Sequence, residues 1–235
     1  INTVRGQESN HCTLNPLDGY VTTKDGNLQS NTSSGWQGIR ATHGMSSGKF
    51  YWESQNDQSA AAIIGLADVE ATGFVDGSIF GSGNHSGGVA NPAWTWGGAN
   101  RYFNGSEAGT SLSNHGVADV VQYAFDADNG HLWFGRNGFW YTPDWKAGAN
   151  PAIGLNPTVT GIYTDKTYVP CANFVGGSAR FNFGQKPFKF APPDGFQPIN
   201  GSTIRPEKVI TRPDQYHGVV LYKGCLLYTS DAADD

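Results

Sequence analysis

The stretch YAFDADNGHLWFGRNGFWY, residues 123–141, holds the acidic series that most invites a chemical role. Its DADNG segment, residues 126–130, suggests a calcium loop. A loop of the EF-hand type needs a glycine at its sixth position, a Glu at its twelfth and five or more oxygen ligands. Here the glycine already stands at the fifth position, and no acidic residue follows in the rest of the stretch. The oxygen ligands are too few, so we expect no metal site.

The same residues are typical of tight turns. Asp and Asn tolerate a left-handed backbone, and Gly130 permits a positive φ. In RNGF, Asn137 and Gly138 form the strongest short hairpin signal, because both central residues of such a turn need a positive φ. The sequence therefore predicts a three-stranded antiparallel meander over 119–141.

Other patterns that could support catalysis each lack part of their chemistry. GMSSG (44–48) matches the G-x-S-x-G of a nucleophile elbow around Ser46, but an elbow joins a strand to a helix, and here Gly48 leads into an aromatic strand. Glu53 lies on that strand without the second carboxylate that a glycosidase requires at a fixed separation. The six His residues show no HxH or HExxH spacing, which disfavours zinc. We expect no enzyme and no cofactor.

The elements that would position these residues are short strands. Glycine occurs 32 times, aromatic residues make up 13% of the chain and charged residues 15%. Strand signals bounded by Gly, Asn, Asp or Ser recur roughly every 8 to 12 residues, which indicates an all-β sandwich. No stretch shows helical periodicity. The aromatic residues assigned to its core are Trp52, Phe125, Trp133, Phe181 and Phe183.

Charge and hydropathy narrow the class of partner. The net charge is −5, and the 15 Lys and Arg are scattered. Phosphate binding needs clustered cations, so we expect no nucleic-acid partner. No apolar run approaches the roughly 20 residues that cross a bilayer, and no signal peptide opens the chain. The three cysteines lack CxxC spacing and do not suggest a disulfide framework.

Five motifs, taken together, resemble the landmarks of SPRY domains. They cover roughly residues 40–199 and are GKFYWE (48–53), IGLAD (64–68), YAFDADNGHLWFGRNGFW (123–140), YVPCANF (168–174) and ARFNFGQKPFKFAPPDGF (179–196). The resemblance implies a bent antiparallel β-sandwich of two sheets, of the concanavalin-like jelly-roll type. It also implies a non-catalytic protein-interaction module that binds through loops at one end. Trp94 and Trp96 depart from the smaller aromatic residues expected in that family strand.

The segments that flank the SPRY-like region suggest the kind of protein to which it belongs and where its domains begin and end. NHCTLNPLD (10–18) and RPDQYHGVVLYKG (212–224) resemble segments around SPRY domains in phage and metagenomic tail-fibre-type proteins. This implies a virion or extracellular location and a homo-oligomer within a fibre. We expect a fragment made of the sandwich with its N-terminal extension (1–199), a linker (200–224) and a non-native, adaptor-derived tail (225–235).

Binding is expected in two segments, 71–105 and 156–167, which are the longest polar connections. Aromatic residues and Arg commonly anchor interfaces, which nominates Trp94, Trp96, Arg101, Tyr102 and Tyr163. Trp94 and Trp96 are two residues apart, so in a strand both side chains would lie on the same face. That face can be the inward one, so a role of the two tryptophans in the core is the alternative.

Two functions follow. The chain is expected to be a binding or structural module that recognises a protein or host-surface receptor. The alternative is a lectin-like module that binds glycans on aromatic platforms.

Overall fold

The computed structural model describes residues 10–19, 21–31, 36–57, 61–70, 93–97, 100–103, 106–110 and 116–204. For the three segments from 93 to 110 it describes the backbone only. The chain divides into the units Ile1–Arg205 and Pro206–Asp235, and every described residue lies in the first. The structure thus describes a single body.

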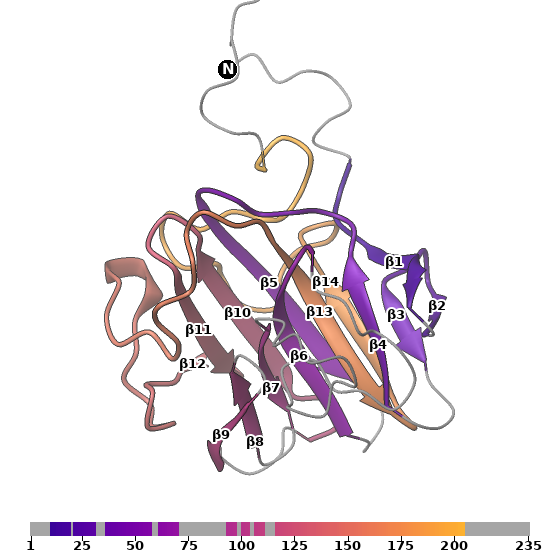
Figure 1. Cartoon of the computed structure of the whole chain (residues 1–235), viewed down its shortest axis with the longest axis horizontal. Helices are drawn as coiled ribbons and strands as arrows, with labels where there is room; N and C mark the ends of the chain where they lie inside the picture. Colours follow the sequence, from indigo (N-terminus) through magenta and orange to yellow (C-terminus); the bar gives the residue numbers. More distant parts are fainter. Residues whose placement is uncertain are drawn as a thin grey trace, which may run out of the picture. The chain divides into compact units, whose positions relative to one another are not determined.

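Fourteen strands in the described part of the chain form two antiparallel sheets (Figure 1). The first sheet has the order β1-β4-β13-β6-β7-β8-β9. Its strands are β1 (Leu14–Gly19), β4 (Trp36–Ala41), β6 (Ala61–Asp68), β7 (Ala93–Gly97), β8 (Asn100–Phe103), β9 (Ser106–Thr110) and β13 (Tyr168–Val175).

The second sheet has the order β12-β11-β10-β5-β14-β3-β2. Its strands are β2 (Thr22–Lys24), β3 (Gln29–Asn31), β5 (Lys49–Asn56), β10 (Val120–Asp126), β11 (His131–Arg136), β12 (Phe139–Trp140) and β14 (Ser178–Asn182). One short 3₁₀ turn, η1 (Pro151–Ile153), follows β12. The predicted all-β sandwich of two sheets is confirmed.

The predicted meander over 119–141 is also confirmed. Strand β10 pairs with β11, and β11 pairs with β12. Asn137 and Gly138 have φ values of 51° and 89°, the positive pair that the hairpin signal requires. Asp126 accepts hydrogen bonds from the backbone and side-chain nitrogens of Asn129 at 3.1 and 2.8 Å. The acidic series is therefore turn chemistry.

Aromatic side chains fill the space between the sheets. Trp52 of β5 stacks on Tyr123 of β10 with ring centroids 5.0 Å apart and planes within 5°. Phe174 of the first sheet meets Phe181 of the second edge-on at 6.5 Å, so this contact joins the two layers. Such aromatic pairs add roughly 0.5–1.5 kcal/mol each beyond the apolar area that they bury. All five residues assigned to the core from sequence are buried: Trp52, Phe125, Trp133, Phe181 and Phe183.

The two cysteines of the described region are free thiols inside this body. Burial raises the pKa of Cys12 to about 12. Burial likewise raises the pKa of Cys171 above its ordinary value, against a smaller opposing effect of Arg40. Both thiols therefore stay protonated at neutral pH and are poor nucleophiles.

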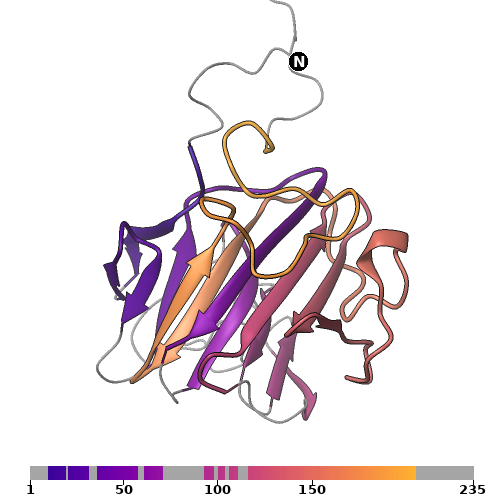
Figure 2. The same cartoon turned by 180° about the vertical axis from the view of Figure 1, so that it is seen from behind.

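The second sheet is covered on both of its faces along β10, which is why every residue of that strand is inaccessible. Its outer face carries Tyr51, Ala124 and Trp133, which cluster with Phe196. Phe196 belongs to the chain after β14, residues 184–199, which we call the strap. Figure 2 shows the strap crossing in front of the strands of this sheet.

Glu53 fastens the strap to the sheet. Its carboxylate, only 4% exposed, accepts hydrogen bonds from the backbone N–H groups of Lys189 and Phe190 at 2.8 and 2.9 Å. It also accepts one from the hydroxyl of Tyr51 at 2.8 Å. Burial, and then the Glu53 charge, raises the pKa of Tyr51, so the phenol stays protonated and can donate. This buried charge is paired with three donors.

The chain remains packed on the sandwich beyond residue 199. The backbone N–H of Cys12 donates to the carbonyl of Ile199 at 3.1 Å, and that of Gly201 donates to the carbonyl of Asn10 at 2.9 Å. Ile204 packs against the main core. The described beginning of the expected linker is thus attached to the body.

Replacing Glu53 with Gln should destabilise the protein. The side-chain amide of Gln keeps one acceptor oxygen, but its NH2 group would face one of the two backbone N–H donors of the strap. We therefore expect the free energy of unfolding to fall by about 1.5–3 kcal/mol. Urea denaturation measures this loss, and hydrogen exchange should show the amides of Lys189 and Phe190 losing protection. Glu70→Gln, the same change at an exposed carboxylate, is the control. Equal stability of the two variants would contradict the role of Glu53.

Candidate functional site

Four connections gather at one end of the sandwich, which we call the loop end: residues 42–48, 69–70, 127–130 and 160–167. They lie together because β4, β6 and β10 finish there and β5 and β13 begin there, as the pairings of Asp68 with Tyr168 and Asp126 with Lys49 show. Figure 1 shows the β4–β5 connection running along the top of the view. The expected binding segment 156–167 therefore contributes to this end.

The acidic turn at 127–130 holds the neighbouring connections of the loop end in place. The Asp128 carboxylate accepts a hydrogen bond from the backbone N–H of Gly48 at 2.9 Å. The carbonyl of Gly130 accepts one from the backbone N–H of Ile162 at 3.2 Å. Gly130 has a φ of 62°, and a Cβ there would stand 2.0 Å from the carbonyl oxygen of Ile162. Only glycine allows this close approach.

Tyr163 rests on that supported segment and points an aromatic side chain outward. It is 58% exposed, and Val69 from the next connection is 43% exposed. Tyr168 lies buried, and its backbone exchanges two hydrogen bonds with the backbone of Met45, at 2.7 and 3.0 Å. Burial, with the carboxylates of Asp68 and Asp165, raises the pKa of Tyr168, so its hydroxyl stays neutral. The exposed ring thus has a rigid base.

Two ion pairs brace the loop end. The Lys166 ammonium lies 2.7 Å from a carboxylate oxygen of Asp68, and this hydrogen bond, with the charge of Asp68, raises the pKa of Lys166. Arg40 binds both carboxylate oxygens of Asp18 and donates to the carbonyl of Val69. The exposed groups that remain at the loop end include the side chains of Tyr163 and Val69 and the carboxylates of Glu70 and Asp165.

The other nominated residues lie on β7 and β8, at the edge of the first sheet. Trp94 and Trp96 are the register partners of Leu66 and Ile64, whose side chains are fully buried. In turn, Arg101 pairs with Trp96, and Tyr102 pairs with Thr95. Their side chains, and residues 71–92 of the expected binding segment 71–105, lie outside the described residues. Their role in binding stays a prediction.

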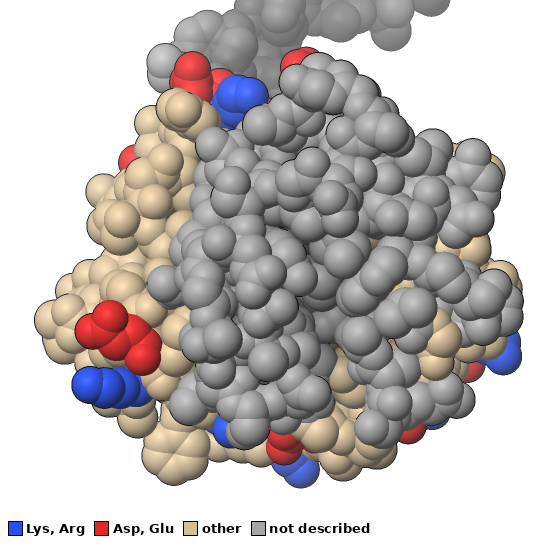
Figure 3. All heavy atoms as spheres, turned by 60° about the horizontal axis from the view of Figure 1, so that its bottom comes forward, with Lys and Arg blue, Asp and Glu red and all other residues tan. Residues whose placement is uncertain are grey.

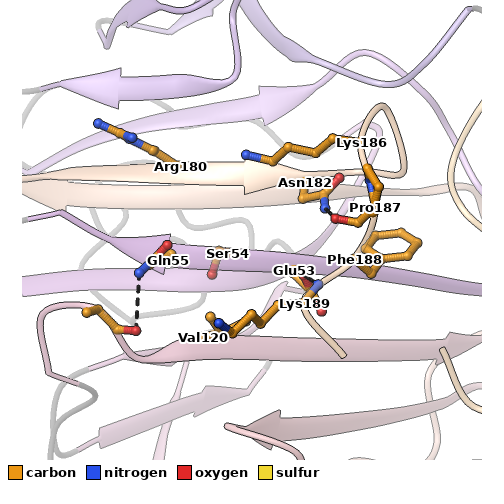
Figure 4. Close-up of a pocket in the computed structure, with 11 residues that line it drawn as sticks. Glu53, Ser54, Gln55, Val120, Arg180, Asn182, Lys186, Pro187, Phe188 and Lys189 are labelled. Atoms are coloured by element: carbon orange, nitrogen blue, oxygen red, sulfur yellow. Dashed lines mark hydrogen bonds between the residues drawn. The ribbon is translucent and has the colours of Figure 1, made fainter. Parts of the chain in front are cut away.

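A pocket of about 390 Å³ opens on the outer face of the second sheet (Figure 4). Its floor is formed by β14, β5 and β10, and its wall is residues 186–189 of the strap. Arg180, Lys186 and Lys189 surround it. Sequence reasoning did not find this pocket, because its residues come from four distant parts of the chain.

The residues weighed for catalysis have structural surroundings. Ser46 lies in the connection between two strands and at no strand-to-helix elbow. All the hydrogen bonds of the Glu53 carboxylate serve the strap and Tyr51. Among the described residues, no three His, Cys, Asp or Glu side chains are grouped to hold a metal ion.

The surface charges are mixed in sign. On the face shown in Figure 3, the acidic and basic side chains of the described residues lie beside one another. Such mixing means that the described residues of that face form no extended positive field for a polyanion. Within the part of the chain that the structure describes, no helix is long and apolar enough to span a bilayer.

Comparisons with known proteins agree on the fold. The SPRY domain of human HERC1 aligns with 74% of this chain and 99% of its own length, with a TM-score of 0.52 and 18% sequence identity. The sandwich therefore has the SPRY fold that the five motifs imply. No family model matches the chain.

The curated relatives are much longer proteins. The ATP-dependent RNA helicase DDX1 of Xenopus laevis is 23% identical over 187 residues, 78% of this chain and 22% of the helicase. The helicase Ddx1 of Drosophila melanogaster is 26% identical over 176 residues, 74% of this chain and 21% of the helicase. The chain spans about a fifth of the length of the curated relatives it matches.

Replacing Gly130 with Ala should loosen the base of the loop end. A left-handed backbone costs an L-residue about 1–2 kcal/mol, and displacing the carbonyl of Ile162 should add roughly 1–3 kcal/mol. Gly26→Ala is a matched control, because Gly26 has a φ of 67° and open space around its Cβ position. Chemical denaturation should show the larger loss for Gly130→Ala. Equal losses of stability in the two variants would mean that the approach of a Cβ to the Ile162 carbonyl costs no stability beyond that of the left-handed backbone.

Proposed function

We propose that this chain is a non-catalytic module that binds a protein partner through its loop end. The observation that carries the proposal is Tyr163, an aromatic side chain 58% exposed on a segment whose backbone is hydrogen-bonded to Gly130 and Val69. Interfaces commonly centre on such anchors, since a rigid aromatic ring buries much area at little entropic cost.

The SPRY fold supports this reading, because the family to which the motifs point consists of protein-interaction modules that bind through loops at one end. An enzyme is disfavoured by the chemistry of the described groups. The buried Glu53 carboxylate is saturated with donors, and the thiols of Cys12 and Cys171 are protonated. A catalytic carboxylate or thiolate must be able to exchange a proton or attack a substrate.

The setting that we propose for the module is a virion protein of the phage tail-fibre type, located in the virion or outside the cell. Only the flanking sequences 10–18 and 212–224 support this setting. Within a fibre, the module would act as a homo-oligomer and contact a host-surface receptor or a neighbouring component.

Substitution of Tyr163 tests the loop end directly. Peptides are selected from a random display library on the immobilised chain, and their dissociation constants are measured in solution. We expect Tyr163→Ser to weaken their binding about tenfold or more, as loss of an interface anchor does. Phe139→Ser is the matched control, because Phe139 is an aromatic residue 64% exposed at the opposite end of the sandwich.

Two results would count against the proposal. The first is a set of peptides whose affinity drops for Phe139→Ser and not for Tyr163→Ser. The second is saturable binding to defined glycans on an array, lost in Tyr163→Ser, which would establish the lectin-like alternative instead.

A further inference from the structure

The pocket on the outer face of the second sheet is separate from the loop end. Its floor lies toward the ends of β5 and β14 that are away from the loop end, around Gln55 and Arg180, which are register partners. Ala118 closes the far side and accepts a hydrogen bond from the Gln55 side chain at 3.2 Å. The apolar filling of this face stops at Phe188, which packs edge-on against Tyr51 at 4.8 Å. Beyond Phe188 the face is open.

Positive charge gathers around this opening. Figure 4 shows Lys186 extending along β14 on the side of Arg180, and Lys189 extending beside Val120 of β10. Arg180 forms an ion pair with Asp57, at 3.1 Å. Neither lysine ammonium has an ion-pair partner among the described residues. The lining therefore holds two lysines with no ion-pair partner among the described residues, together with the Arg180–Asp57 pair and the buried Glu53 carboxylate, in a protein whose net charge is −5.

The wall that carries these lysines is fixed before any ligand arrives. Asn182, 6% exposed, donates to the carbonyl of Pro187 at 3.1 Å and accepts from the backbone N–H of Gly184 at 3.1 Å. Glu53 holds the backbone N–H of Lys189. Anchors on both sides of residues 186–189 reduce the entropy lost on binding, because only the lysine side chains remain to be ordered.

We propose that this pocket binds an acidic peptide segment of a protein partner, with carboxylate side chains of the segment between Lys186 and Lys189. A volume of about 390 Å³ accommodates one or two side chains. Val120, Pro187 and Phe188 provide apolar contacts for the stems of Asp or Glu side chains, next to the charges. A long nucleic acid fits less well, since the two lysines would neutralise few phosphates and the chain as a whole carries a net charge of −5.

The test uses a fluorescent, terminally blocked pentaglutamate peptide and its pentaglutamine counterpart, titrated with the full chain at low salt. We expect the pentaglutamate peptide to bind and the pentaglutamine peptide not to bind. The double variant Lys186→Gln, Lys189→Gln should weaken it roughly twofold to thirtyfold, the range for two exposed ion pairs. The control is Lys24→Gln, Lys146→Gln, which removes the same charge from exposed lysines elsewhere.

Three outcomes would overturn the proposal. These are equal binding of the two peptides, equal loss in the two double variants, and displacement of the peptide by inorganic phosphate at an equal concentration of charge, which would indicate a simple anion site. Peptides selected at the loop end should bind the Lys186→Gln, Lys189→Gln variant normally. Failure of this inference is thereby distinguishable from failure of the proposed function.

Discussion

The hydrogen bonds between the Glu53 carboxylate and the strap are the constraint on which much of this structure depends. The outer face of the second sheet carries large aromatic residues that cannot be left in water, and residues 184–199 cover them. An irregular segment of this kind has few backbone partners of its own. A buried carboxylate that accepts two adjacent backbone N–H groups defines where the segment crosses the sheet. The position of this crossing also places Lys186 and Lys189 beside the pocket.

A second use of carboxylates organises the loop end. Asp126 closes its own turn through Asn129, and Asp128 reaches the backbone of Gly48. Both side chains serve backbone geometry and so hold strands and connections in register. With these two groups engaged internally, the loop end presents an exposed tyrosine on a fixed base, while Lys186 and Lys189 lie at the pocket. The two surfaces thus differ in chemistry, one aromatic and one cationic, and suit different features of a partner.

Much of the fold could be predicted because its signals are local. Alternating aromatic strands, the Asn137-Gly138 pair and Gly130 each specify backbone conformation within a few residues. The motif set from 48 to 196 then identified the sandwich. Tyr163 could be nominated because it stands in a long polar connection. The same logic named Trp94, Trp96, Arg101 and Tyr102, for which the structure supplies the strand register alone.

The sequence by itself determined the class of fold, the turns and the aromatic core, because backbone preference and hydrophobic pattern act over short distances. Only the tertiary structure decided what Glu53 does, since its partners are backbone N–H groups, which every residue except proline carries and no sequence pattern reveals. The pocket, too, could be found only in the tertiary structure. Gln55, Val120, Arg180 and Lys186 become neighbours only when the strap lies across three paired strands. Long-range pairing, and the need to bury the outer face, bring them together.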